Sequence, residues 1–358
     1  MTEHDVLFGD VWLCSGQSNM QLTVNMIYNA TEEIANAGNY PKIRVFTAAL
    51  MASSVPIEEL LGIDLDWSVA SAHSIGGPDW THMSAVCWLY GRMIHQALNA
   101  RPIGLIGTSW GGTVIEYWMP PKALEDCDIP PNISNYAPSY SDSIQAPVLN
   151  HSNLFNSMIH PFTRMVLYGI AWYQGENNVG YNRDKHACSF SKLIFYWRQI
   201  WFNRTNGLTH IEFPFGFVQL STHTNDSNWI GRLPSIRWHQ TFDVGHVPNY
   251  VVLKVFMAVA CDLRDDLNSI HPRYKHDVGY RLSQSGLAIA YGQKVEFQGP
   301  LVEKITHSDD SKLINVTYTS VSSIDIRNHY GFDVCSRFFL SFFEYKNHFL
   351  FELGLLFG

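Results

Sequence analysis

Strand-like and helix-like segments alternate along most of the chain, and this alternation is the strongest constraint on its fold. Short apolar runs predict buried strands at residues 10–14, 42–46, 103–106, 165–173, 213–220 and 251–260. Apolar residues at helical spacing predict helices at residues 83–98, 192–202, 236–242 and 280–291. Strands connected by helices pair in parallel and are covered on both faces, so the pattern predicts an α/β fold with a parallel sheet.

Composition and charge support a globular chain and exclude several classes of partner. Hydrophobic residues make up 46% of the 358 residues and charged residues only 16%, which is enough to form a large core. The net charge is −8 and no basic stripe is visible, which argues against nucleic acids and acidic membranes as partners.

The pattern changes after Gly292, where strand-like runs at 295–297, 313–318 and 323–326 follow one another without helices. We therefore predict an α/β domain over residues 1–292 and a partial β-rich region over 293–336. Residues 337–358 form an atypical tail rich in Phe and Leu. Charged residues interrupt the tail, so it contains no apolar run of about 20 residues and no membrane span is expected.

The cysteines and glycosylation sequons give a hint about the compartment. Cys127 and Cys188 lie in polar, loop-like surroundings and could form a disulfide in an oxidising compartment. Cys14, Cys87 and Cys261 lie in apolar runs and are expected to be small core residues. Residues 1–6 are polar and acidic, and no signal peptide is visible there. Asn-x-Ser/Thr sequons, which would suit a secretory-route protein, occur at Asn29, Asn132, Asn150, Asn203, Asn225 and Asn315.

Ser18 lies between the first predicted strand and a helix-like segment. The carboxyl ends of strands are where open α/β sheets place reactive groups. A helix that starts there offers free backbone N–H groups to a developing anion. Ser18 is therefore a candidate nucleophile, and the alternative is that it only caps the helix.

A serine nucleophile needs a base and donors for the oxyanion. His271 follows the strand at 251–260 and is the best candidate base, whereas His239 and His160 are less well placed. Candidate oxyanion donors are the Ser18 N–H, the glycine-rich turn at 107–113, and the side-chain amide of Gln174, which follows the strand at 165–173. Each of these could also be structural.

Four ordered blocks carry a resemblance to a known family: residues 16–20, 109–118, 172–176 and 269–272. Their order and spacing resemble the sialate O-acetylesterase family, which belongs to the SGNH-type hydrolases among the carbohydrate esterases. The similarity extends from about Asp5 to about Val334. It implies a flavodoxin-like three-layer α/β/α sandwich, a truncated β region at the C-terminus, and a lysosomal or secreted location.

The resemblance also implies an activity, the removal of O-acetyl groups from sialic acids without a metal or cofactor. Ser18 corresponds to the family's nucleophile and His271 to its catalytic base. Gly111 or Gly112, together with the amide of Gln174, correspond to its oxyanion partners.

The chain departs from the family in three respects. Many SGNH enzymes carry an Asp three residues before the His, where this chain has Asn268. Asp262, Asp265 and Asp266 could replace it, and we favour Asp262 because it follows a strand directly. Family members also begin with a signal peptide and a further N-terminal region, and continue into more β structure. The alternative functions are therefore an inert truncated form that keeps the scaffold, or an acetylesterase for another acetylated carbohydrate.

The substrate contacts are predicted from residue chemistry. Arg237 could bind a sialic acid carboxylate, or could form a structural ion pair. Trp110 could stack on a sugar ring, and Asn156 and Gln17 could line the pocket. Glu176 could orient Gln174 or Gln17 by hydrogen bonding.

Overall fold

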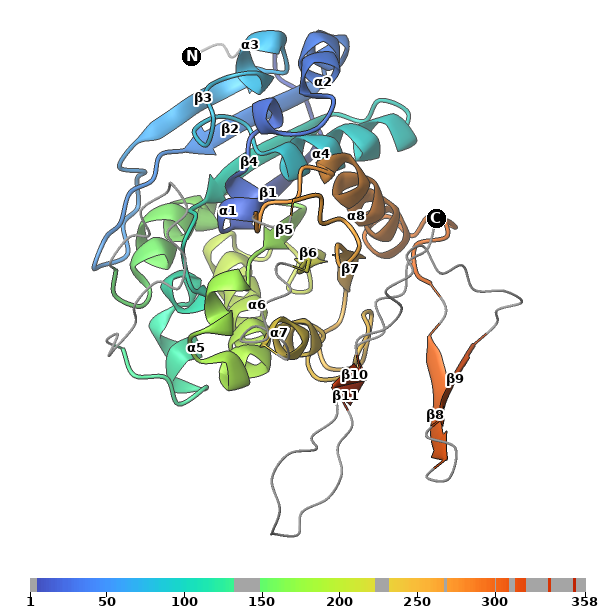
Figure 1. Cartoon of the computed structure of the whole chain (residues 1–358). Coiled ribbons are helices and arrows are strands. Elements are labelled where there is room, and N and C mark those ends of the chain that lie inside the picture. The colour runs from blue at the N-terminus through green and yellow to red at the C-terminus, as the bar shows by residue number, and fades with distance from the viewer. Residues whose placement is uncertain are drawn as a thin grey trace. The chain divides into compact units, whose positions relative to one another are not determined.

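A seven-stranded sheet in the order β3-β2-β4-β1-β5-β6-β7 organises residues 1–296 (Figure 1). All its neighbouring strands pair in parallel except β3, which runs antiparallel to β2 at one edge. The predicted α/β class is therefore confirmed. The strands are β1 Asp10–Gly16, β2 Ile43–Ala48, β3 Ile63–Val69, β4 Ile103–Ser109, β5 Gly169–Tyr173, β6 Phe215–Gln219 and β7 Val255–Val259.

The structure is a computed structural model. It describes residues 5–131, 149–222, 232–266, 269–299, 301–308, 313–319, 334–335 and 350–351. The predicted strand at 323–326 and most of the predicted tail at 337–358 lie outside these ranges.

Helices cover both faces of the sheet. On one face, α4 (Ala85–Ala97) and α8 (Lys275–Ile289) lie side by side and share a core cluster with Trp12 and Cys14 of β1 (Figure 1). On the other face, α6 (His186–Arg204) packs in a second cluster that contains Leu13. Because alternate residues of β1 enter opposite clusters, the strand is buried on both faces and its sequence is an apolar run. This arrangement is the expected three-layer sandwich.

The remaining helices are shorter than α4, α6 and α8. The remaining α-helices are α1 Ser18–Gln21, α2 Ala30–Asn36, α3 Ala72–Ile75, α5 Pro121–Glu125 and α7 Arg232–Gln240. Single turns of 3-10 or π-helix are η1 Val24–Met26, η2 Ala37–Asn39, η3 Ile115–Trp118, η4 Phe155–Ile159, η5 His160–Arg164, η6 Glu176–Val179 and η7 Arg183–Lys185.

Residues 297–358 form a second unit. Strand β8 (Val302–Ser308) pairs antiparallel with β9 (Leu313–Tyr318), and β10 (Val334–Cys335) pairs with β11 (Leu350–Phe351). The strand predicted at 313–318 is thus β9. The residues predicted as a strand at 295–297 have no regular secondary structure.

Two disulfides cross-link the first unit. The Cys127–Cys188 bridge that the sequence suggested is present. Cys14 and Cys87 were expected to be separate core residues, and this prediction is wrong because the two form a disulfide with Cα atoms 5.8 Å apart. Cys14 faces the α4 side of the sheet, which brings it within bonding distance of Cys87 on that helix. Closing a loop of 73 residues stabilises a fold by roughly 4 kcal/mol.

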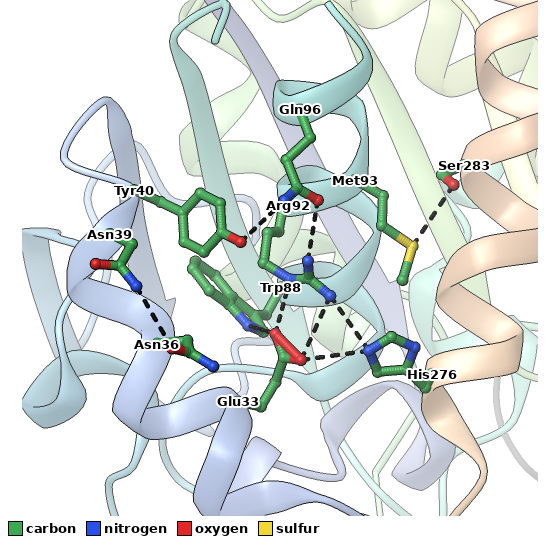
Figure 2. A network of polar contacts seen from close by, with 10 residues as sticks. All are labelled: Glu33, Asn36, Asn39, Tyr40, Trp88, Arg92, Met93, Gln96, His276 and Ser283. Carbon is green, nitrogen blue, oxygen red and sulfur yellow. Dashed lines mark hydrogen bonds and ion pairs between the residues drawn. The ribbon is translucent and has the colours of Figure 1, made fainter.

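A buried polar network, which we call the Glu33 network, joins α2, α4 and α8 (Figure 2). The Glu33 carboxylate accepts a hydrogen bond from Trp88 Nε1 at 3.2 Å and pairs with Arg92 Nε at 2.7 Å. His276 Nε2 lies 3.3 Å from the same carboxylate. The network therefore connects three helices on one face of the sheet.

Candidate active site

Ser18 is the first residue of α1, at the carboxyl end of the central strand β1, and its side chain is largely buried. Gly16 makes the turn before it with a φ of 141°, and a Cβ at Gly16 would lie 2.1 Å from the Tyr173 carbonyl oxygen. Only glycine fits this conformation without strain. The residue at the N-cap of α1 is Gln17, so Ser18 does not have the capping role that was its alternative interpretation.

Three amide side chains of the Ser18 turn, those of Gln17, Asn19 and Gln21, fasten it to the surrounding loops. The first is Gln17, whose Oε1 accepts hydrogen bonds from the backbone N–H of Gly175 at 3.2 Å and of Asn177 at 3.4 Å. Its Nε2 donates to Asn177 Oδ1 at 3.2 Å. Gln17 therefore ties the end of β1 to the loop after β5, and its buried side chain has a structural role that the sequence did not predict.

The second is Asn19, which connects the Ser18 turn to the loop that carries His271. Asn19 Nδ2 donates to the Ile270 carbonyl at 3.0 Å and to Glu176 Oε1 at 2.6 Å. Its Oδ1 accepts from Lys275 Nζ at 2.5 Å. The structure thus brings the residue after Ser18 into direct contact with the residue before His271.

The third is Gln21, which connects the turn to Trp80 and to the glycine-rich turn after β4. Gln21 Nε2 donates to the Trp80 carbonyl at 2.8 Å, and Gln21 Oε1 accepts from the Gly111 N–H at 2.7 Å. The ring centroids of Trp80 and His271 are 5.3 Å apart in an edge-to-face arrangement. Trp80 is half-buried and has a φ of 66°, which is rare for a bulky residue and is found at strained functional positions. Sequence reasoning missed Trp80, which has no motif around it.

His271 lies on the loop between β7 and α8 and is half-buried. Its backbone N–H donates to Ser269 Oγ at 3.1 Å. The two rival histidines are engaged elsewhere. His239 Nδ1 lies 2.6 Å from Asp243 Oδ1, and His160 Nδ1 lies 2.9 Å from the Ile57 carbonyl. His271 is therefore the candidate histidine whose loop is bonded to the Ser18 turn.

Two of the expected oxyanion donors are committed to other acceptors. The Gly111 N–H donates to Gln21. Gln174 Nε2 donates to the Thr113 carbonyl at 3.2 Å and to Asn178 Oδ1 at 2.7 Å, which uses both of its hydrogens. The oxyanion roles expected of Gly111 and Gln174 stay predictions, and both groups donate within the fold. Gly112, with a φ of 72°, donates its N–H in no hydrogen bond found among the described residues.

The orientation of the Gln174 amide is fixed by a buried chain of partners. The Ile115 N–H donates to Asn178 Oδ1 at 2.9 Å, and Asn178 Nδ2 donates to Glu116 Oε2 at 3.0 Å. Asn178 Oδ1 therefore faces Gln174 as an acceptor, and only the Nε2 of Gln174 can meet it. Burial raises the pKa of Glu116 to about 7, although hydrogen bonds from Asn178 and Asn182 act in the opposite direction.

Two of the three acidic candidates for orienting His271, Asp262 and Asp265, are held by arginines. Both carboxylate oxygens of Asp262 accept from Arg281, at 2.6 and 2.7 Å. Asp265 accepts from the backbone and side chain of Arg273, at 3.1 and 2.7 Å. Asp262 therefore anchors α8 through Arg281, in place of the contact with His271 that we expected. Asn268 lies outside the described residues.

The predicted substrate residues are mostly engaged within the fold. The buried guanidinium of Arg237 lies 3.4 Å from the Leu220 carbonyl and 3.3 Å from the Ser221 carbonyl. Asn156 is buried and donates to the Ser53 carbonyl at 3.1 Å. Trp110 is half-buried against the α6-side core cluster. Glu176 accepts from Asn19, whereas the amides that it was expected to orient, those of Gln174 and Gln17, donate to other residues.

The described ranges contain no group of three or more His, Cys, Asp or Glu side chains that could hold a metal ion. Within the same ranges, none of the helices has the length and apolar character needed to cross a bilayer.

Comparisons with known proteins show the family to which the chain belongs. The family model described as carbohydrate esterase, sialic acid-specific acetylesterase, matches residues 8–284. Sialate O-acetylesterases of Mus musculus and Homo sapiens are each 44% identical to the chain over 92% of its length. The chain spans 66% of the mouse protein and 63% of the human protein, or just under two thirds of each.

A solved structure is also similar. The crystal structure of a carbohydrate acetylesterase from Xanthomonas citri has a TM-score of 0.67 and 26% identity to the chain, and the similarity covers 83% of this chain and 60% of that one.

Proposed function

Because the chain belongs to the sialic acid-specific acetylesterase family of carbohydrate esterases, we propose that it hydrolyses O-acetyl esters of sialic acids. In this proposal Ser18 is the nucleophile and His271 is the general base.

One observation supports these roles above all others, the hydrogen bond from Asn19 to the Ile270 carbonyl at 3.0 Å. It joins the neighbours of Ser18 and His271, which are far apart in the sequence. Ser18 and His271 both follow the carboxyl ends of strands of the sheet. Strands β2 to β4 lie on one side of β1 and strands β5 to β7 on the other, so the strand order reverses at β1. Ligand sites in open α/β sheets form at such a point.

The proposed reaction proceeds through an acetyl-enzyme. His271 takes the proton of the Ser18 hydroxyl as Ser18 Oγ attacks the acetyl carbonyl carbon. The tetrahedral intermediate collapses by breaking the bond to the sugar oxygen, which receives the proton from His271. Water then attacks the acetyl-enzyme, again with His271 as base, and acetate leaves while Ser18 regains its proton.

The oxyanion needs donors that are not already used. We assign this role to the backbone N–H groups of Ser18 and Gly112, because neither donates elsewhere among the described residues. Removing one donor of this kind typically costs 10²–10³ in rate. Trp80, which lies edge-on to His271, is well placed to contact the sugar.

The proposal is tested by acetate release from an O-acetylated sialic acid. We expect the purified chain to release acetate, and Ser18→Ala and His271→Ala each to lower kcat by roughly 10³-fold or more while circular dichroism stays unchanged. A folded wild-type chain that releases no acetate would overturn the proposal and favour an inert scaffold.

A second substrate class is favoured by one observation, the similarity to the carbohydrate acetylesterase of Xanthomonas citri. The same assay on acetylated xylan distinguishes the two. Faster turnover of the polysaccharide than of the acetylated sialic acid would shift the assignment to that class.

We also propose that the chain acts in the secretory route, in a lysosome or outside the cell. Both disulfides support this, because such bonds persist in oxidising compartments. Mass spectrometry of protein purified from lysosomes and from culture medium would test it, and an exclusively cytosolic protein with four reduced thiols at these positions would contradict it.

A further inference from the structure

We infer that Asn19 is a positioning residue that holds His271 in register with Ser18, and that Glu176 and Lys275 fix the orientation of its amide. The inference rests on the proposed function, since it concerns the residues assigned to that reaction. Asn19, Glu176 and Lys275 are all buried and come from three different segments of the chain. We call them the Asn19 cluster.

The partners of Asn19 allow only one orientation of its side chain. Nδ2 has two hydrogens, and they point to two acceptors, the Glu176 carboxylate and the Ile270 carbonyl. Oδ1 faces the Lys275 amino group. In its charged form this group has three hydrogen-bond donors and no acceptor. A rotated amide would place oxygen against two acceptors and nitrogen against a cation, so the cluster excludes it.

Lys275 is fully buried, which is rare for a lysine and has a high energetic cost. Its amino group lies 2.5 Å from Asn19 Oδ1 and 5.0 Å from the centre of the Tyr173 ring. Burial lowers the pKa of Lys275 to about 7, and the charges of Glu176 and Asp265 oppose this shift. Burial also raises the pKa of Glu176. Burying Lys275 and Glu176 therefore does not by itself stabilise the fold. Their burial is explained by the control that they exert on the orientation of the Asn19 amide.

The contact to Ile270 gives this orientation a consequence for catalysis. Ile270 directly precedes His271 in the chain, and Asn19 directly follows Ser18. A change in the length of the Asn19–Ile270 hydrogen bond therefore moves His271 relative to Ser18. A misplacement of about 1 Å in a reacting group can cost about 100-fold in rate. Asn19 touches neither substrate nor reacting atoms in this scheme, so its action is positional.

The decisive variant is Asn19→Asp, which keeps the size of the side chain but removes both donated hydrogen bonds. We expect kcat to fall by about 100-fold with KM nearly unchanged. The amide hydrogens of residues 269–273 should also exchange faster with solvent when followed by mass spectrometry. This second readout does not depend on activity, so it tests the positioning even if the wild-type chain proves inactive and the proposed function fails.

A double variant separates positioning from structural support. In Asn19→Asp with Glu176→Gln, the amide at position 176 can donate to the new carboxylate, but the Ile270 carbonyl still lacks its donor. We expect the double variant to regain thermal stability relative to Asn19→Asp while kcat stays low.

The matched control is Glu33→Gln, which neutralises another buried carboxylate in the Glu33 network and should leave kcat and exchange at residues 269–273 unchanged. The inference is overturned if Asn19→Asp retains kcat within about threefold and normal exchange. It is also overturned if the double variant restores kcat together with stability, because the role would then be structural.

Discussion

Lys275 and His276 are consecutive residues at the start of α8, yet they belong to different polar networks. Lys275 is buried and donates to Asn19, the residue after Ser18. His276 is half-exposed, with 47% of its side chain accessible, and approaches Glu33 between α2 and α4 (Figure 2). Neighbours on one helix turn thus serve two regions of the molecule.

The two networks differ in what they hold together. The Asn19 cluster connects α1, η6 and the start of α8, and each of its contacts to Asn19 is a single hydrogen bond. The Glu33 network connects helices that already pack through a shared apolar core, and Glu33 receives several contacts at once. We conclude that polar groups in the first network set the geometry of the site, whereas those in the second add to stability.

The largest effect is expected from Arg92→Met, which should act on stability alone. Arg92 and Glu33 form a buried ion pair at 2.7 Å, and removing one partner leaves the other charge uncompensated. The free energy of unfolding should fall by about 3 kcal/mol, measured by urea denaturation. At temperatures where the variant is folded, kcat should equal that of the wild type, and a matching loss of kcat would break the distinction between the networks.

The next effect is expected from Lys275→Met, which should act mainly on catalysis. The variant removes the donor to Asn19 Oδ1, so the amide loses the partner that fixes its orientation. We expect kcat to fall by about 100-fold, or about 2.7 kcal/mol in activation free energy. Thermal stability should change less than in Arg92→Met. Full activity in steady-state assays would show that Lys275 does not control the site.

The Asn19 cluster should also give stability a pH dependence on the alkaline side. The pKa of Lys275 is about 7 in the folded chain, against an ordinary value of 10.5. Between these values the unfolded chain binds the extra proton, so stability rises with pH, by at most about 1.4 kcal/mol per pH unit. Urea titrations from pH 7 to 10 should show this slope in the wild type and a smaller one in Lys275→Met. Equal slopes of stability against pH in the wild type and in Lys275→Met would mean that Lys275 is not desolvated in the folded chain.

Much of the fold could be predicted because it follows from local patterns. The parallel strands are continuous apolar runs, and Ser18 was placed at a strand end from the residues on either side of it. Strand β3 was missed because it lies at an edge of the sheet, where Leu65 is its only buried residue. It therefore has no apolar run to reveal it.

The connections within the site could not be predicted, because they join residues that are distant in the sequence. Asn19 is separated from Ile270 by 251 positions, and the residues on either side of them do not specify this contact. Lys275 lies in a polar segment that reads as an exposed helix start, yet it is fully buried. The Cys14–Cys87 bridge was missed for the same reason, since each cysteine alone fits an apolar core.

The smallest effect is expected from His276→Leu. His276 is the residue after Lys275, so this variant is the direct comparison for Lys275→Met. Burial alone would raise the pKa of Glu33, but the hydrogen bond from His276 and the charge of Arg92 outweigh it, so the pKa is lowered. A lowered carboxyl pKa stabilises the folded chain at pH values above the ordinary pKa of 4.5. This contribution is lost as the pH falls through the pKa of Glu33 in the folded chain. Because His276 is half-exposed, its share should be less than about 1 kcal/mol. In urea titrations the difference between wild type and variant should therefore be present at pH 7 and disappear at pH 3, with kcat unchanged. A fall in kcat as large as that of Lys275→Met would mean that both residues act on the site, and that the two networks are coupled through the first turn of α8.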